Sequence, residues 1–280
     1  MAENKLYVVA TPIGNLADIT QRAVDVLKTV DLVACEDTRH SKRLLNHLEI
    51  SKPLLAAHDH NEGQAAQTII AKLEQGMNVA LVSDAGTPLI ADPGYHIAQA
   101  VIAAGFDVVP IPGSCAIIVA LMGSALPTDR FLFDGFLPGK SHGRQQYFAS
   151  IKSQERTIVV YESPHRILAA LEDMQEVLGS DREIVIAREL TKTFETFLRG
   201  TVAHVSDVMK ADSNQLKGEF VVVIKGAIPA KKQEVSDEAI RLTLLLADEL
   251  PMKKAAAIAA QYTGHKKNQL YQLALEAKSA

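Results

Sequence analysis

The sequence predicts an α/β protein with two α/β domains, a mostly parallel sheet in the first and a mixed sheet in the second, followed by a small helical region. The chain has 280 residues, 48% hydrophobic and 22% charged, which is typical of folded protein but longer than one usual domain. Short apolar runs alternate with segments of helical periodicity. Gly, Pro and charged residues gather after these runs. We expect regions at 1–125, 126–229 and 230–280.

The first region contains five apolar runs that we expect to form a mostly parallel sheet with helices on both faces. Each run is followed by a polar loop and then by apolar residues at helical spacing. The expected strands are 6–10, 31–36, 53–57, 77–82 and 106–111. The expected helices are 19–30, a short one ending at Leu48, 65–76, 94–105 and one ending at Met122.

The turns that follow these strands hold the residues with chemical potential, whereas the turns that precede them are ordinary. The longest, SDAGTPLIADPG, combines two glycines and two prolines with Asp84 and Asp92. In a parallel sheet all such turns emerge at the carboxyl edge, where open α/β sheets bind ligands. The other loops at this edge are TPIGN, EDTRH, HDHNE and PGSC. The sequence therefore predicts one cleft lined by five loops.

The second region begins with 126–144, rich in Gly, Pro and basic residues, which we interpret as a crossing between domains. Three apolar runs follow and predict a shorter, mixed sheet facing the same cleft. Charged residues again follow the strands. The expected strands are 156–161, 182–187 and 217–226, with a helix ending at Leu178 between the first two.

The C-terminal region is helical, rich in Ala and Leu, and basic. From Pro251 to Ala280 the net charge is +4, against −4 for the whole chain. Such a surface suits a polyanion, although a solvated helix face explains it equally well. The stretch resembles a helix-turn-helix, with Ala260, Gly264 and Leu270 near turn and core positions.

The sequence lacks the motifs of several other classes of enzyme. No GxxxxGK[ST] loop occurs, no GxGxxG follows the first strand, and Ser114 lacks the second Gly of a nucleophile elbow. His58, His60 and Glu62 allow a metal site, but HDHN also reads as a helix cap, so we expect no metal. Only two cysteines occur, and neither a signal peptide nor a membrane span is apparent, so we expect a cytoplasmic protein.

Eight motifs in order resemble the tetrapyrrole methylase superfamily of S-adenosyl-L-methionine enzymes. They are TPIGNLADIT, EDTRHS, HDHNE, SDAGTPLIADPG, PGSCA, YESPHR, ARELTKTFE and KGEFVVVIKG. The resemblance covers nearly the whole chain and is strongest to the branch that methylates the ribose 2′-hydroxyl of a cytidine in the decoding region of small-subunit (16S) rRNA. It implies two α/β domains with the cofactor in the trough between them, a homodimer, and small-subunit rRNA or the assembled small ribosomal subunit as partner.

The resemblance also implies which residues bind S-adenosylmethionine. Many relatives have Gly-Asp-Pro where this chain has Gly86, Thr87 and Pro88, with its Asp two positions earlier at Asp84, whose role stays open. The residues expected at the cofactor are Ile13, Gly14, Asp84, Gly86, Thr87, Leu89, Ile90, Ser114, Cys115, Ala116 and Tyr161.

A ribose 2′-hydroxyl is a weak acid, so a nearby base should assist its attack. The candidate catalytic residues are Asp37, His165, Glu189 and Lys192, with His58 as a further candidate base. The candidate substrate contacts, including Arg clamps for phosphates, are Arg39, His58, Arg166, Arg188, Lys253, Lys254, Lys266 and Lys267. Two alternatives remain open at this point: a methyltransferase for a small tetrapyrrole, and a non-catalytic rRNA-binding assembly module.

Overall fold

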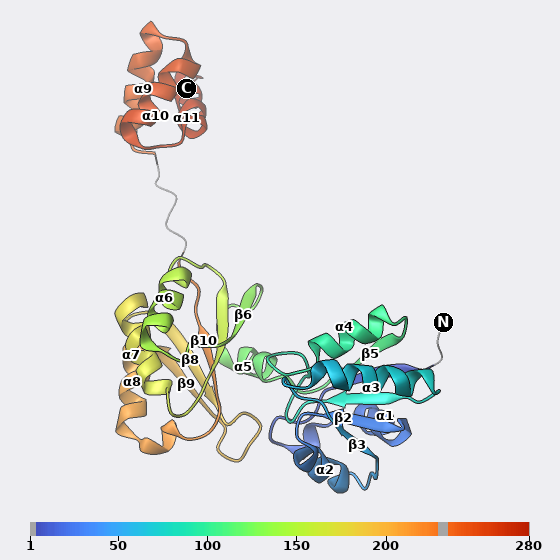
Figure 1. The fold of residues 1–280 in the computed structure, drawn as a ribbon. Helices are drawn as coiled ribbons and strands as arrows, with labels where there is room; N and C mark the ends of the chain where they lie inside the picture. The colour runs from blue at the N-terminus through green and yellow to red at the C-terminus, as the bar shows by residue number, and fades with distance from the viewer. Residues whose placement is uncertain (1–3, 229–234, 280) are drawn as a thin grey trace. The chain divides into compact units, whose positions relative to one another are not determined.

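The computed structural model describes residues 4–228 and 235–279. The chain forms two compact units, Met1–Ala227 and Ile228–Ala280. The first unit contains two five-stranded sheets, and the second is a group of three helices (Figure 1). The predicted fold class, two α/β domains with C-terminal helices, is confirmed, whereas the exact boundaries of the three regions stay predictions.

The first sheet is entirely parallel, with strand order β3-β2-β4-β1-β5. Its strands are β1 (Lys5–Val9), β2 (Leu32–Cys35), β3 (Leu54–Ala56), β4 (Val79–Val82) and β5 (Asp107–Ile111). Helices cover both faces, as predicted, because alternate strand residues point to opposite sides. The apolar sides of α3 (Glu62–Glu74) and α4 (Tyr95–Ala103) join one buried cluster, and those of α1 (Gln21–Thr29) and α2 (Thr38–His47) join the other.

The second sheet is mixed, with strand order β6-β7-β10-β8-β9. β6 and β7 are parallel, whereas β10 runs antiparallel to both β7 and β8. Its strands are β6 (Phe131–Phe136), β7 (Thr157–Glu162), β8 (Glu183–Arg188), β9 (Thr196–Thr201) and β10 (Phe220–Ile224). The helices α6 (Ser141–Ile151), α7 (Ile167–Leu178) and α8 (Val202–Ala211) pack on one face, and α5 (Ala116–Ser124) packs on the other.

Several elements of the second domain differ from the sequence prediction. The segment 126–144 is not only a crossing: it contains β6 and the start of α6. The alternation of β6 is interrupted at Gly135, which has φ of +69°, and the pairing with β7 shifts register between Phe133 and Phe136. β9 was also missed, because TFLRGT has two Thr, one Arg and one Gly among its six residues and so lacks a continuous apolar run. The helix α8 that follows it was not predicted either.

The C-terminal unit consists of α9 (Asp237–Glu249), α10 (Met252–Thr263) and α11 (Lys267–Ser279). Gly264 ends α10 in the left-handed conformation at φ +74°, which allows the tight turn into α11. Leu270 is fully buried among alanines of α9 and α10, and Ala260 packs against this cluster. The predicted helix-turn-helix positions are therefore confirmed. Within the described part of the chain, none of the helices combines the length and apolarity that crossing a membrane would require.

Candidate active site

A cavity of about 360 Å³ lies between the carboxyl edge of the first sheet and the second sheet. Loop residues of the first sheet, among them Ile13, Asp84 and Ala116, meet Tyr161 at the end of β7. A smaller hollow of about 60 Å³ shares several of these residues and is also lined by Gly86, Thr87, Ile90 and Cys115. A cleft is therefore present, and residues from both sheets line it. Of the five predicted loops, those after β1, β4 and β5 contribute to its described lining, whereas EDTRH and HDHNE do not.

Backbone pairing holds the central loop, residues 83–94, against the end of β1. Gly86 and Thr11 exchange two backbone hydrogen bonds, with N···O distances of 2.8 and 3.1 Å. Gly86 has φ of +87°, and a Cβ there would lie 3.1 Å from Ile13 Cγ2, so glycine suits both the turn and the close approach. The Thr87 hydroxyl donates to the Ser114 carbonyl at 3.1 Å and ties this loop to the one after β5.

Most of the predicted cofactor residues meet at these two hollows, and three lie just outside. Gly14 packs against the side chain of Lys192, and a Cβ at Gly14 would overlap it. Leu89 is left-handed at φ +72° and packs over Gly94, and Ser114 contributes its carbonyl to the loop contact. The predicted residues that line the hollows are Ile13, Asp84, Gly86, Thr87, Ile90, Cys115, Ala116 and Tyr161.

The cavity is acidic. Of the described residues that line it, all four charged ones are carboxylates: Asp84, Asp92, Glu162 and Glu219. Burial raises the pKa of Asp92 to about 6; the hydrogen bond from Ser83 opposes this rise and the neighbouring carboxylates, Glu36 first, add to it. A cationic ligand would reduce the repulsion between these carboxylates. The charge and volume of the cavity therefore suit a small cationic molecule.

Aromatic rings form part of the second-domain wall. Tyr161 makes edge-to-face contacts with Phe133 and Phe136, with ring centroids 5.0 and 5.3 Å apart. Burial raises the pKa of the Tyr161 hydroxyl above its ordinary value. Tyr161 and Phe136 of this cluster give the second-domain wall of the cavity an apolar part.

The predicted catalytic residues lie around the cavity, and the described lining includes none of the four. Asp37 caps α2 and pairs with Arg39 at 2.8 Å, and hydrogen bonds from Arg39 lower the pKa of Asp37 to about 2. Lys192 bridges Glu189 and Glu219, each at 2.9 Å. Burial alone would raise the pKa of Glu189, but hydrogen bonds from Lys192 and from the Glu219 backbone N–H outweigh it, so the pKa is lowered. His165 is exposed in the loop before α7.

The predicted phosphate clamps fall into different environments. The Arg39 side chain is 87% exposed on α2, and Arg166 pairs with Glu162 at 2.7 Å with its side chain 32% exposed. Arg188 is 7% exposed and donates to the Lys217 carbonyl and the Thr196 hydroxyl. We therefore correct the assignment of Arg188: its guanidinium stabilises the second domain and is too buried to hold a phosphate.

α2 carries a basic surface next to the cavity. It contains no acidic residue, and its first turn frames a hollow of about 200 Å³ lined by Asp37, Arg39, His40 and Arg43. The backbone N–H of Asp37 donates to Asp84 Oδ1 at 3.1 Å, which joins the start of α2 to the cavity. The exposed side chains that form this surface, here called the α2 basic face, are Arg39, His40, Lys42, Arg43 and His47.

His58 is half-buried beside this region, with its ring centroid 6.1 Å from that of His60. The Glu62 carboxylate accepts a hydrogen bond from the Gly94 backbone N–H at the start of α4. Asn61 accepts from the His58 N–H, so HDHN acts as a turn before α3. Residues 4–228 and 235–279 contain no group of three His, Cys, Asp or Glu side chains that could hold a metal ion.

Sequence reasoning missed several lining residues. β10 runs antiparallel to β7, so Phe220 at its start lies opposite Glu162 at the end of β7. Residues that precede β10 therefore reach the same edge as residues that follow β7, and a search confined to loops after strands overlooks them. The lining residues outside our predicted site are Ala85, Asp92, Phe136, Glu162, Ser163, Pro164, Leu190, Glu219, Phe220 and Val221.

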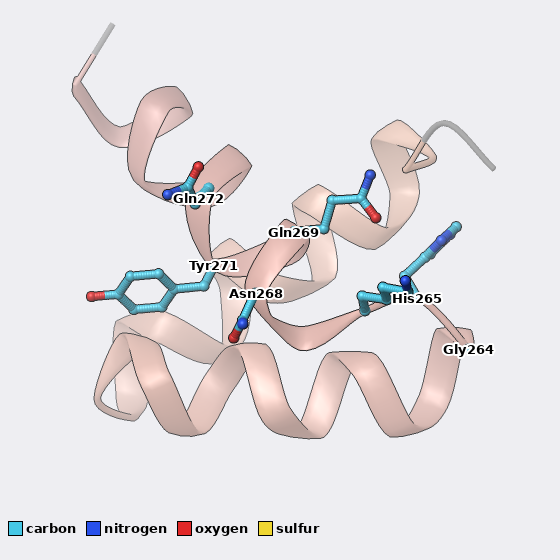
Figure 2. Close-up of a pocket in the computed structure, with 7 residues that line it drawn as sticks. Gly264, His265, Asn268, Gln269, Tyr271 and Gln272 are labelled. Atoms are coloured by element: carbon cyan, nitrogen blue, oxygen red, sulfur yellow. The ribbon is translucent and has the colours of Figure 1, made fainter. Parts of the chain in front are cut away.

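The C-terminal unit has its own hollow, of about 630 Å³, at the turn between α10 and α11. Figure 2 shows Asn268 and Tyr271 projecting from one side of α11, and Gln269 and Gln272 from another. Its described lining residues are Gly264, His265, Lys266, Asn268, Gln269, Tyr271 and Gln272, which include no carboxylate. Lys253, Lys254, Lys266 and Lys267 are exposed on α10 or at the start of α11.

Comparison with known proteins matches this architecture. A family model described as Tetrapyrrole (Corrin/Porphyrin) Methylases matches residues 5–206, and one described as RsmI C-terminal HTH domain matches residues 233–278. Proteins named Ribosomal RNA small subunit methyltransferase I are similar over nearly their whole length. That of Escherichia coli O157:H7 is 53% identical, covering 98% of this chain and 96% of the relative. The chain belongs to the ribosomal RNA small subunit methyltransferase I family.

Other members of the ribosomal RNA small subunit methyltransferase I family are similarly close. The protein of Haemophilus influenzae is 52% identical and covers 96% of both chains. That of Pseudomonas aeruginosa is 51% identical over 99% of this chain and 98% of its own. Among solved structures, uroporphyrin-III-C-methyltransferase from Thermus thermophilus has a TM-score of 0.57 at 19% identity, covering 80% of this chain and 94% of its own. The methyltransferase CobJ has a TM-score of 0.60 at 16% identity, and the match covers 80% of this chain and 95% of CobJ. At these identities the likeness shows the fold that the family shares.

Proposed function

We propose that this chain is an S-adenosylmethionine-dependent methyltransferase that modifies the ribose 2′-hydroxyl of a cytidine in the decoding region of 16S rRNA. The observation that carries the proposal is the separation of charge at the site. An acidic cavity suits a cationic cofactor, and the α2 basic face beside it suits a polyanionic substrate. The relatives' names support small-subunit rRNA as the substrate. The 2′-hydroxyl target rests on the resemblance of the sequence motifs.

The cavity residues fit S-adenosylmethionine in charge and in shape. Its sulfonium and ammonium groups are cations, which the carboxylates of Asp84 and Asp92 would stabilise. The close backbone approach at Gly86, and the loop tied by Thr87, would hold the methionine and ribose portions. When bound, the sulfonium supplies an activated methyl group, so the protein needs mainly to align two reactants.

The RNA would reach the cavity along α2. A nucleotide entering an acidic cavity must be held by its phosphates outside it, where Arg39 and Arg43 are exposed. Arg166, half-buried at the rim beside Glu162, can contact the backbone on the second-domain side. The hollow of the C-terminal unit offers groups that suit RNA: side-chain amides for hydrogen bonding, Tyr271 for stacking, and Lys266 as a cation.

Two other functions fit these surfaces less well. A small tetrapyrrole carries no phosphate backbone, so it would use neither the α2 basic face nor the C-terminal lysines. A non-catalytic assembly module has no use for a preformed cavity whose loops are tied together at Gly86 and Thr87. Both observations favour methyl transfer to RNA.

One experiment separates the three. The protein is incubated with methyl-labelled S-adenosylmethionine and, in parallel, with small ribosomal subunits, naked rRNA and a tetrapyrrole precursor. We expect label in RNA at a linkage that resists alkali, because a methylated 2′-oxygen blocks cleavage. Label in the macrocycle, or tight RNA binding without transfer, would refute the proposal.

We further propose a cytoplasmic homodimer. The free thiols of Cys35 and Cys115 are compatible with a reducing compartment. Exposed Ile118 and Met122, one turn apart on α5, offer apolar area for a second copy. Sedimentation equilibrium of the wild type and of Met122→Glu tests the dimer, and a monomeric wild type would refute it.

A further inference from the structure

One residue that lines the cavity, Glu162, has a buried carboxylate oxygen without a hydrogen-bond partner among the described residues. Glu162 ends β7, and its side chain is fully buried. Its Oε1 accepts from the Ser163 N–H at 2.6 Å and from Nε and Nη2 of Arg166 at 2.8 and 2.7 Å. Its Oε2 is equally buried and has no hydrogen-bond partner among residues 4–228 and 235–279.

Such an oxygen is unusual, because buried polar groups in proteins almost always have partners. Glu162 lines the 360 Å³ cavity, so a ligand there can supply the missing donor. The Arg166 and Ser163 bonds fix the carboxylate at the end of a strand, which is how a preorganised acceptor is held. Glu162 Oε2 could therefore accept a hydrogen bond from an O–H or N–H group of a bound molecule.

The position of Glu162 favours the substrate over the cofactor. The smaller hollow is lined by Gly86, Thr87 and Ile90, which we assign to S-adenosylmethionine, and Glu162 is not among its described lining residues. Asp84, also assigned to the cofactor, lines the larger cavity together with Glu162. Glu162 lines the other part of the cavity together with Ser163 and Pro164. These residues begin the loop that carries exposed His165 and Arg166.

We propose that Glu162 is a catalytic residue whose Oε2 accepts the proton of the attacking ribose 2′-hydroxyl; this inference rests on the proposed function. As the hydroxyl oxygen bonds to the methyl carbon, the bond from that carbon to sulfur breaks and its electrons neutralise the sulfonium. The hydroxyl proton passes to the Glu162 carboxylate and then to solvent. Charge and atoms balance without another reactant.

The first test measures binding only. Glu162→Gln keeps an Oε1 acceptor for Arg166 and Ser163 but places an N–H donor where Oε2 was. With S-adenosylhomocysteine present, the wild type should bind small-subunit RNA about 10- to 100-fold more tightly than the same RNA with a 2′-deoxy target cytidine. Glu162→Gln should lose that preference, and Glu162→Asp should retain part of it. An unchanged preference in Glu162→Gln would overturn the inference.

The second test follows the reaction. In single turnover, Glu162→Gln should transfer methyl about 100- to 10,000-fold more slowly, with cofactor affinity by calorimetry within about twofold of wild type. Loss of cofactor affinity with an intact preference for ribose would assign Glu162 to the cofactor and overturn the proposal. Wild-type protein that labels no 2′-oxygen would overturn the proposed function itself, and this inference with it.

The same domain offers a matched control. Asp173 is 6% exposed, pairs with Arg144 at 2.7 Å, and lies outside the cavity lining. Asp173→Asn likewise removes a charge from a buried ion pair, so it should lower stability but keep the ribose preference. Loss of the preference in this variant too would trace the effect to the fold of the domain and overturn the role of Glu162.

Discussion

The backbone N–H of Asp37 donates to Asp84 Oδ1 at 3.1 Å and joins the start of the basic helix α2 to the acidic cavity. The same Asp37 accepts from the Arg39 N–H as the cap of α2. One residue thus connects the surface that we assign to RNA with the loop that we assign to the cofactor. A shift of either element would move the other.

Asp92→Asn should weaken S-adenosylmethionine binding about tenfold at pH 7.5, since a buried anion beside a cation is lost. The pKa of Asp92 is raised to about 6 by burial and by Glu36, Asp84 and Asp59, which face it. A bound cation favours the ionised carboxylate, so binding releases a proton when the pH is below about 6. Wild-type affinity should therefore fall as the pH drops from 7 to 5.

Calorimetry across this pH range checks the assignment. The Asp92→Asn curve should be flatter than that of the wild type, because its side chain does not titrate. Parallel curves for the two proteins would show that the pH dependence arises elsewhere, and Lys210→Gln, an exposed change on α8, serves as the control.

Arg39→Ala with Arg43→Ala should lower RNA affinity and reduce the salt slope of log K by about 0.7 to 0.9 for each lost phosphate contact. Both side chains are exposed on α2, so the melting temperature should hardly change. Arg188→Ala should instead lower the free energy of unfolding by about 2 to 4 kcal/mol, because it removes a buried side chain and strands its acceptors. A stable Arg188→Ala protein with weak RNA binding would reinstate it as a clamp.

Lys266→Gln with Lys267→Gln should weaken RNA binding about tenfold and reduce its salt dependence, while cofactor affinity stays unchanged. Lys278→Gln is the control, because Lys278 is on α11 together with Lys267 and lies 3.8 Å from Asp248. Filter binding at several salt concentrations measures both. Equal effects of the three lysines would indicate general electrostatics and not a defined surface.

Gly113→Ala should destabilise the loop after β5 by about 1 to 3 kcal/mol. Its Cβ would lie 2.9 Å from Ala10 Cβ and 3.3 Å from the Ala10 carbonyl, so the loop must move. The Thr87 bond to Ser114 would weaken, and cofactor affinity should fall with it. Gly63→Ala in α3 is the control and should be neutral or stabilising by up to about 1 kcal/mol, because no heavy atom lies within 4 Å of the new Cβ. Chemical denaturation measures the free energy of unfolding of both variants.

The first domain could be predicted closely from the sequence because its strands are continuous apolar runs and each polar loop follows a strand. The second domain could be predicted only in part: its mixed sheet and the strands β7, β8 and β10 were expected, whereas β6, interrupted at Gly135, and β9, which lacks a continuous apolar run, were not. Periodicity also gives no strand direction, so β10 was predicted as a strand but its antiparallel pairing with β7, which brings Glu219 and Phe220 to the cavity, was not. Likewise, a strand-terminal Arg such as Arg188 reads as functional until its burial is known.

The acidic lining also bears on which adenosine compounds the protein admits. S-adenosylmethionine and ATP share an adenosine, but ATP carries a chain of phosphates where the cofactor carries cations. Phosphates would meet Asp84 and Asp92 at short range in a partly buried site, where repulsion is weakly screened. In its proposed role, the enzyme would therefore discriminate against phosphate-bearing nucleotides through the charge of its cavity lining.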